Sequence, residues 1–154
     1  MTRTCLLPVV LTAVCAFAGS LCWAAEPENL DEVRSVRNLE RRSRQALEYA
    51  HAALDRAVKT YLDGDMRRGL QQFLEVEEAV ELSQESLEAT RKIPSKSPKH
   101  FKRAEIETRK LLRELENAER QVNFDDRDHV RAVYDRVEEI NRELLLGIMT
   151  KPKK

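Results

Sequence analysis

Cysteine and tryptophan are scarce in this chain, and their positions exclude several classes of function. All three cysteines (Cys5, Cys15 and Cys22) and the single tryptophan, Trp23, lie within the first 24 residues. The rest of the chain contains no cysteine, which excludes a disulfide, a thiolate nucleophile, a zinc–thiolate site and a haem-attachment pair there. That part must therefore be stabilised by its own core.

Glycine, proline and aromatic residues are also few, whereas charged residues are abundant. The 154 residues include four glycines and five prolines, with 5% aromatic and 35% charged residues. This composition favours long helices over sheet and leaves too little glycine for a phosphate-cradling loop. The formal net charge is +0, from 27 basic and 27 acidic residues, so we expect no nucleic-acid partner.

The first 24 residues have the layout of a secretory signal peptide. Arg3 supplies a positive charge, an apolar run follows over residues 5–17, and the small residues Cys22 and Ala24 precede a cleavage point at Ala25. The run is short for a membrane span and acidic residues follow it, which favours cleavage over retention. We therefore expect export, with a bacterial periplasm favoured for a chain without disulfides. Secretion or N-terminal anchoring are the alternatives.

Apolar residues at three- and four-residue steps predict a single all-α domain over residues 25–150, with a disordered basic tail at 151–154. A first helix is expected over about 27–62 and a second over about 66–91. The apolar stripe of the first helix nearly lapses at residues 40–44, so its early half is expected to bend or to project.

Two further helices follow the clearest linker, in which Ser97-Pro98 fits an N-cap and a first helical position. Both carry heptad patterns: Phe101, Ala104, Thr108, Leu111, Leu115, Ala118 and Val122, then Val130, Val133, Val137, Ile140 and Leu144. The simplest assembly is an antiparallel, up-down-up-down bundle of about four long helices with an overlong first helix. An elongated pair of hairpins, or a dimer that buries the leftover stripe, is the alternative.

The turn between the first two helices carries a recognisable pattern of small and aromatic residues: Ala57, Tyr61, Gly64, Gly69, Leu70 and Phe73. This pattern resembles the helix–turn–helix centre of a tetratricopeptide repeat, in which small residues let two helices approach and aromatic residues fill the gap. The resemblance covers residues 57–73 only, because no proline ends the second helix and no second copy follows. It implies a tight helical hairpin.

Glu48 and His51 are the candidate metal ligands, because they have the Glu-x-x-His spacing of di-iron helical bundles. Such a site needs a second pair and two more inward carboxylates, and the near-copy from Asp126 to His129 lies at a helix start. The histidines and serines show no catalytic spacing. We therefore expect no enzyme, no cofactor and no metal, and keep Glu48 and His51 as low-ranking candidates.

Residues 91–103 carry six cations and no acidic residue: Arg91, Lys92, Lys96, Lys99, Lys102 and Arg103. Lysines beside the exposed N–H groups of a helix start would form an anion site for a phosphate group, a lipid headgroup or an acidic partner. The alternative is that these cations are solvated or pair with acidic faces of the bundle.

Three hypotheses follow from the sequence. The leading one is a non-enzymatic exported protein that acts through protein–protein interaction, as a scaffold, adaptor or chaperone-like binder, with an unknown partner or a second copy covering the leftover apolar stripe. The second is binding of an anion or a membrane surface through the linker 91–103. The third is a metal-binding four-helix bundle centred on Glu48 and His51.

Overall fold

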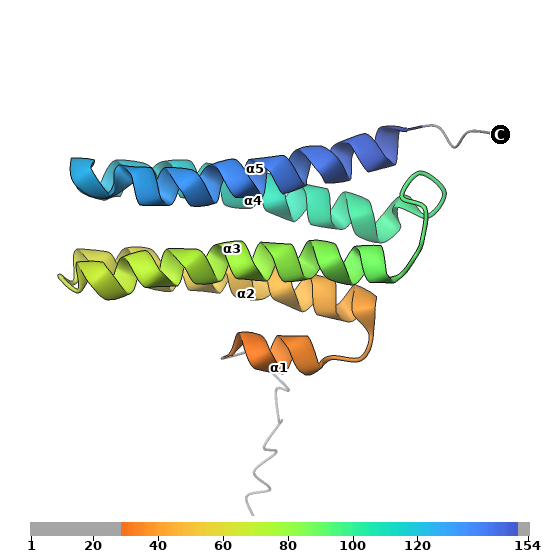
Figure 1. Cartoon of the computed structure of the whole chain (residues 1–154), viewed down its shortest axis with the longest axis horizontal. Helices are drawn as coiled ribbons and strands as arrows, with labels where there is room; N and C mark the ends of the chain where they lie inside the picture. The colour runs from red at the N-terminus through yellow and green to blue at the C-terminus, as the bar shows by residue number, and fades with distance from the viewer. Residues whose placement is uncertain (1–28, 151–154) are drawn as a thin grey trace, which may run out of the picture.

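Four long helices and one short helix make up the structure, a computed structural model that describes residues 29–150 (Figure 1). They are α1 (Leu30–Ser35), α2 (Leu39–Leu62), α3 (Met66–Ala89), α4 (Pro98–Gln121) and α5 (Arg127–Met149), with a 3-10 turn, η1 (Phe124–Asp126), before α5. The described part contains no strand, which confirms the predicted all-α bundle. The predicted signal peptide and basic tail lie outside the described residues.

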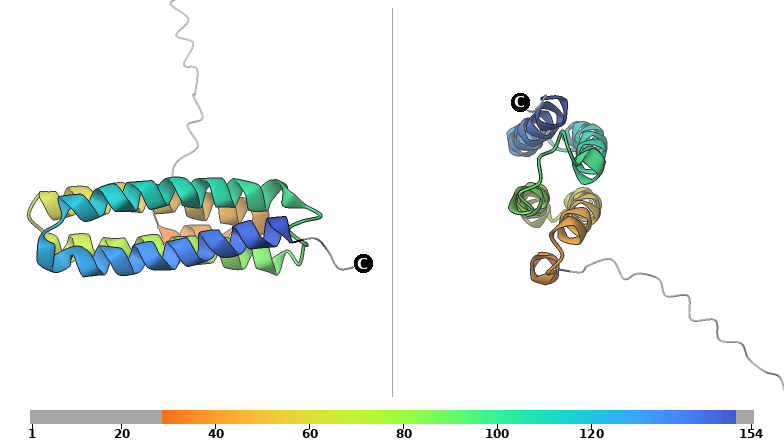
Figure 2. Two further views of the ribbon diagram at one scale, coloured as in Figure 1. Left: turned by 90° about the horizontal axis from the view of Figure 1, so that it is seen from above. Right: turned by 90° about the vertical axis from the view of Figure 1, so that its right-hand side faces the viewer.

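The long helices form two antiparallel hairpins, α2–α3 and α4–α5, stacked on one another (Figures 1 and 2). Helix α2 packs beside α4 and α3 packs beside α5. Directions alternate along the chain, as predicted, so each of these stacked pairs is parallel. The connection from α3 to α4 crosses one end of the bundle diagonally, as the end view in Figure 2 shows.

The two ends of the bundle therefore differ in composition. The linker end holds residues 90–97, the N-termini of α2 and α4 and the C-terminus of α5. The turn end holds the two hairpin turns, residues 63–65 and 122–126. Between these ends, none of the helices described over residues 29–150 is long and apolar enough to cross a membrane.

The first helix is not continuous over the predicted 27–62. Its early half bends, as expected, but at residues 36–38 rather than at 40–44, and α1 folds back onto the α2–α3 hairpin (Figure 1). Asn38 has an extended backbone, and its Oδ1 accepts a hydrogen bond of 2.8 Å from a backbone N–H in the first turn of α2. This cap begins a new helix. Leu30 and Val33 of α1 are buried, so the stripe expected to await a partner is covered within the chain.

The predicted heptads form the centre of the core. Every heptad residue of α4 and α5 is buried, from Phe101 to Val122 and from Val130 to Leu144. Tyr134, expected beside the stripe, is half-buried, whereas Leu145 is exposed. Apolar residues at this spacing stay on one side of a helix over several turns, which is why the pattern identified the buried face.

The α2–α3 hairpin is tight, as the tetratricopeptide-like pattern implied. Gly64 ends α2 with a φ of 101°, a left-handed conformation that glycine adopts without strain. Gly69 lies so close to α2 that a Cβ atom at this position would stand 2.7 Å from the Cβ of Tyr61. Ala57 and Phe73 are buried beside this contact.

Candidate functional site

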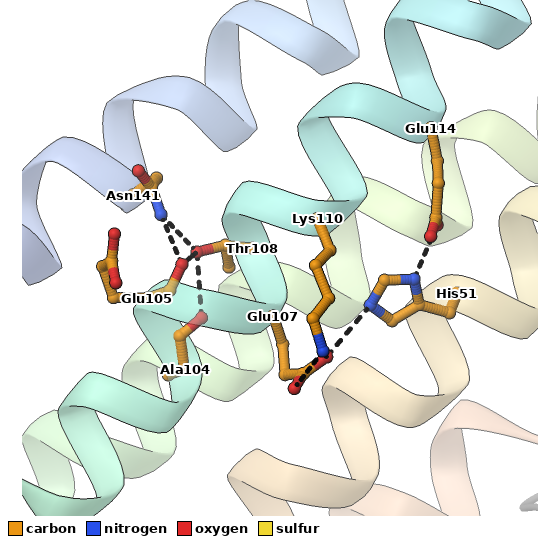
Figure 3. A network of polar contacts seen from close by, with 8 residues as sticks. All are labelled: His51, Ala104, Glu105, Glu107, Thr108, Lys110, Glu114 and Asn141. Carbon is orange, nitrogen blue, oxygen red and sulfur yellow. Dashed lines mark hydrogen bonds and ion pairs between the residues drawn. The ribbon is translucent and has the colours of Figure 1, made fainter.

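Both candidate metal ligands form ion pairs, and His51 lies on the side of α2 that faces α4 (Figure 3). His51 Nδ1 lies 2.6 Å from Glu114 Oε2, and its Nε2 lies 3.8 Å from Glu107 Oε2. Glu48 is exposed and pairs with Arg44 at 3.5 Å. Across residues 29–150, no three His, Cys, Asp or Glu side chains are grouped to hold a metal ion. The observed contacts therefore assign His51 to the α2–α4 packing.

A second network in Figure 3 fixes α5 against α4. Asn141 Nδ2 donates hydrogen bonds to Thr108 Oγ1 at 2.6 Å and to the backbone oxygen of Glu105 at 2.8 Å. Thr108 Oγ1 in turn donates to the backbone oxygen of Ala104 at 2.9 Å. Thr108 is the polar heptad position, and this network satisfies its buried hydroxyl.

The six predicted cations gather at the linker end. Arg91, Lys92 and Lys96 lie in the loop between α3 and α4, and the other three lie in the first two turns of α4. Lys92 donates to Glu40, which also pairs with His100 at 3.1 Å. In the described part of the chain, the remaining five cations make no ion pair, and all five are exposed. The alternative of pairing with acidic faces therefore applies to Lys92 only.

Glu40, in the first turn of α2, experiences the positive charge of this end. Its pKa is lowered from the usual value, first by the hydrogen bond from Lys92 and then by the charges of His100, Lys92 and Lys99, while desolvation opposes the shift. Cations from the loop and from α4 thus act on a single carboxylate of α2. This carboxylate neutralises only part of the positive charge at the linker end.

Exposed apolar side chains occur at the same end of the bundle as these cations. Ile93 of the loop is 48% exposed, and Leu146 and Met149 of α5 are 57% and 71% exposed. The loop packs on the last turns of α5, because a Cβ atom built at Gly147 would lie 3.3 Å from Pro94 Cγ. We call the combined patch the linker-end surface, formed by Ile93, Leu146, Met149, Arg91, Lys96, Lys99 and Lys102.

Sequence reasoning missed the apolar part of this surface. The run Leu144-Leu145-Leu146 contains more leucines than one heptad position can bury, and only Leu144 is buried. This excess was a readable signal for an exposed apolar patch at the end of α5.

A hollow of about 370 Å³ lies between the N-terminal halves of α2 and α4. Its polar lining comes from both helices and includes Arg41, Arg44, Glu48, His51, His100 and Arg103. The hollow therefore brings together Glu48 and His51, predicted as metal ligands, and Arg103, predicted as an anion ligand. Their sequence separation hid this proximity, which follows from the parallel packing of α2 on α4.

The turn end is held together by Tyr61, whose hydroxyl joins the two hairpins. It donates to Asp126 Oδ2 at 2.5 Å and accepts from the backbone N–H of Asn123 at 3.1 Å. Burial, followed by the hydrogen bond to Asp126, raises the pKa of Tyr61.

Phe124 in the same turn is 82% exposed and lies near the exposed Met66, which contacts Asn123. This end therefore also carries exposed apolar side chains.

Comparison with known proteins gives no match: no family model, no curated protein and no solved structure matches this chain. Functional inference therefore depends on the residues and contacts described above. Two features are candidates, the linker-end surface and the hollow between α2 and α4.

Proposed function

We propose that this chain is an exported, non-enzymatic binding protein that uses its linker-end surface to bind an acidic partner protein. The observation that supports this proposal is that exposed Ile93, Leu146 and Met149 share the linker end of the bundle with cations that make no ion pair within residues 29–150. An apolar centre with a charged rim is the usual anatomy of a protein interface, in which methionine and arginine are enriched. A scaffold, adaptor or chaperone-like role fits such a surface.

Both parts of the surface contribute to binding, in different ways. Burying a fully exposed side chain of this size stabilises a complex by about 1.5–3 kcal/mol. Ile93, Leu146 and Met149 are already partly covered, so each contributes correspondingly less. The cations raise the association rate with an acidic partner and make binding weaken with salt. The rest of the bundle supplies a rigid platform, since its heptad residues are buried in the core.

A second candidate function is binding to an anionic membrane surface through the same residues. It is favoured by the absence of any acidic residue from 91 to 103, a stretch that also holds the exposed Ile93. Each Lys or Arg near an anionic leaflet contributes about 1 kcal/mol, so the four cations of the linker-end surface would together be sufficient for weak binding.

Photocrosslinking tests the first candidate directly. A photoreactive residue replaces Met149 in cells that export the chain, and the same residue replaces the exposed Glu138 of α5 as the matched control. We expect a discrete protein adduct from position 149 and none from position 138. Equal adducts from both positions, or none from either, would contradict the proposal.

Vesicle co-sedimentation separates the two candidates. Residues 25–154 are mixed with phosphatidylcholine vesicles with and without phosphatidylglycerol. Binding only to the anionic vesicles, lost in the Lys96→Glu/Lys99→Glu/Lys102→Glu variant, would favour the membrane surface over the protein partner. Failure to bind either kind of vesicle would leave the protein partner as the supported candidate.

A further inference from the structure

The hollow between α2 and α4 is lined by two arginines that make no ion pair within residues 29–150. Arg41 lies in the first turn of α2 and Arg103 lies in the second turn of α4, and both line the hollow. Because α2 and α4 are parallel and pack side by side, the two arginines come from different helices at the same end of the bundle. The hollow also has apolar lining from Leu47 and Ala104.

The carboxylates that line the hollow already have partners. Glu40 binds Lys92 and His100, Glu48 pairs with Arg44, and Glu107 pairs with Lys110 at 3.0 Å. Over the described range 29–150, Arg41 and Arg103 pair with no carboxylate. The lining thus contains two uncompensated positive charges.

Arg41 and Arg103 lie near the N-termini of α2 and α4, and the N-terminus of a helix carries a partial positive charge. In α2 the carboxylate of Glu40 in the first turn already faces this charge. The first turn of α4 has no acidic residue, and its N-cap Ser97 makes no side-chain hydrogen bond. A bound anion would offset the charges of Arg41 and Arg103 together with those of the two helix ends.

We propose that this hollow binds a phosphate monoester, with its phosphoryl group held between Arg41 and Arg103. A single guanidinium satisfies both oxygens of a carboxylate, whereas two guanidinium groups on separate helices suit the larger oxygen set and double charge of a phosphate. His51 also lines the hollow, but its ring lies between Glu114 and Glu107, so the phosphoryl contacts come from the two arginines. The volume of about 370 Å³ leaves room for an organic group against Leu47 and Ala104.

The phosphate monoester has two possible sources, a soluble metabolite or the headgroup of a phosphatidic acid lipid, and the test has an arm for each. Residues 25–154 are titrated with glycerol 3-phosphate in a calorimeter, and separately with phosphatidylcholine vesicles that contain phosphatidic acid. Saturable binding in either arm supports the site and identifies the source. Binding in neither arm would overturn the proposal.

Arginine variants show whether such binding occurs in the hollow. We expect Arg41→Gln and Arg103→Gln each to weaken binding at least about tenfold, and the double variant to abolish it. Arg113→Gln, the same change at an exposed position further along α4, should leave the affinity unchanged. Circular dichroism checks that each variant is folded. An affinity that falls equally in all three single variants, or in none, would overturn the site.

This proposal is independent of the linker-end surface. Met149→Ser disturbs that surface and lies outside the hollow, so it should leave phosphate-ester affinity unchanged while reducing binding of the partner protein. A loss of phosphate-ester binding in Met149→Ser would contradict the assignment to the hollow.

Discussion

The substitution Gly69→Ala tests the packing of the α2–α3 hairpin. In the native structure a Cβ atom at position 69 would stand 2.7 Å from Tyr61 Cβ and 2.9 Å from Tyr61 Cα and N. Two of these atoms are backbone and the third is fixed by it, so no side-chain rotation relieves the clash. The hairpin must open at its turn, and the Tyr61 ring must move with α2.

The expected magnitude combines one gain and two losses. Alanine in place of glycine in a helix interior stabilises by about 1 kcal/mol. Overpacking costs about 1–3 kcal/mol, and weakened hydrogen bonds from Tyr61 to the other hairpin cost about 1–3 kcal/mol more. The net result is a destabilisation of about 1–5 kcal/mol, enough to lower the Tm by several degrees or more.

Urea unfolding followed by circular dichroism measures this change, with Gly147→Ala as the matched control. A Cβ atom at position 147 meets only Pro94 Cγ at 3.3 Å and Cβ at 3.5 Å, in a loop that can yield slightly. We expect the control to be neutral or slightly stabilising. If Gly69→Ala were as stable as the control, helix propensity alone would explain both, and the tight approach of α2 to α3 would be refuted.

Three further predictions concern the hydroxyl groups of serine and tyrosine side chains. Ser43 and Ser83 are buried with their hydroxyl oxygens 2.8 Å apart. Ser43→Ala should therefore lower the free energy of unfolding by about 1–3 kcal/mol, because it leaves the hydroxyl of Ser83 unpaired. In a double-mutant cycle the double alanine variant should recover part of this loss. Tyr61→Phe keeps the ring but removes two hydrogen bonds to the α4–α5 turn and should cost about 1–3 kcal/mol in urea unfolding. Burial raises the pKa of Tyr49, Tyr61 and Tyr134, so the unfolded chain loses its phenolic protons at a lower pH than the folded chain does. The urea midpoint should therefore fall as the pH rises above about 10. An unchanged midpoint between about pH 8 and 11 would contradict this prediction.

The helices of the bundle were predictable because their core positions repeat regularly. The heptads from Phe101 to Val122 and from Val130 to Leu144 give the buried faces of α4 and α5 directly. A bend in the early part of the first helix was predicted from the lapse of the apolar stripe, but its position before α2 was not, because Leu30 and Val33 continue the apolar steps of the following helix. Asn38 was the available signal for a new helix start, since its side chain provides the cap.

The candidate sites were only partly predictable from the sequence. The run of cations at residues 91–103 was readable from the sequence, and all six are exposed. The Glu48–His51 spacing suggested a metal site, whereas in the structure both residues line the hollow. The pairing of His51 with carboxylates of α4 depends on the parallel packing of α2 on α4. That packing follows from the diagonal path of the linker, which no local pattern encodes.

The yield of the photoadduct at position 149, with and without charge reversal, tests the proposed binding function most directly. The comparison uses the native linker and the Lys96→Glu/Lys99→Glu/Lys102→Glu variant, both in cells that export the chain. The proposal predicts a discrete adduct for the native linker and loss of that adduct after charge reversal, because these lysines are exposed at the linker end. An adduct of undiminished yield in the charge-reversed variant would contradict the central role of the linker-end cations.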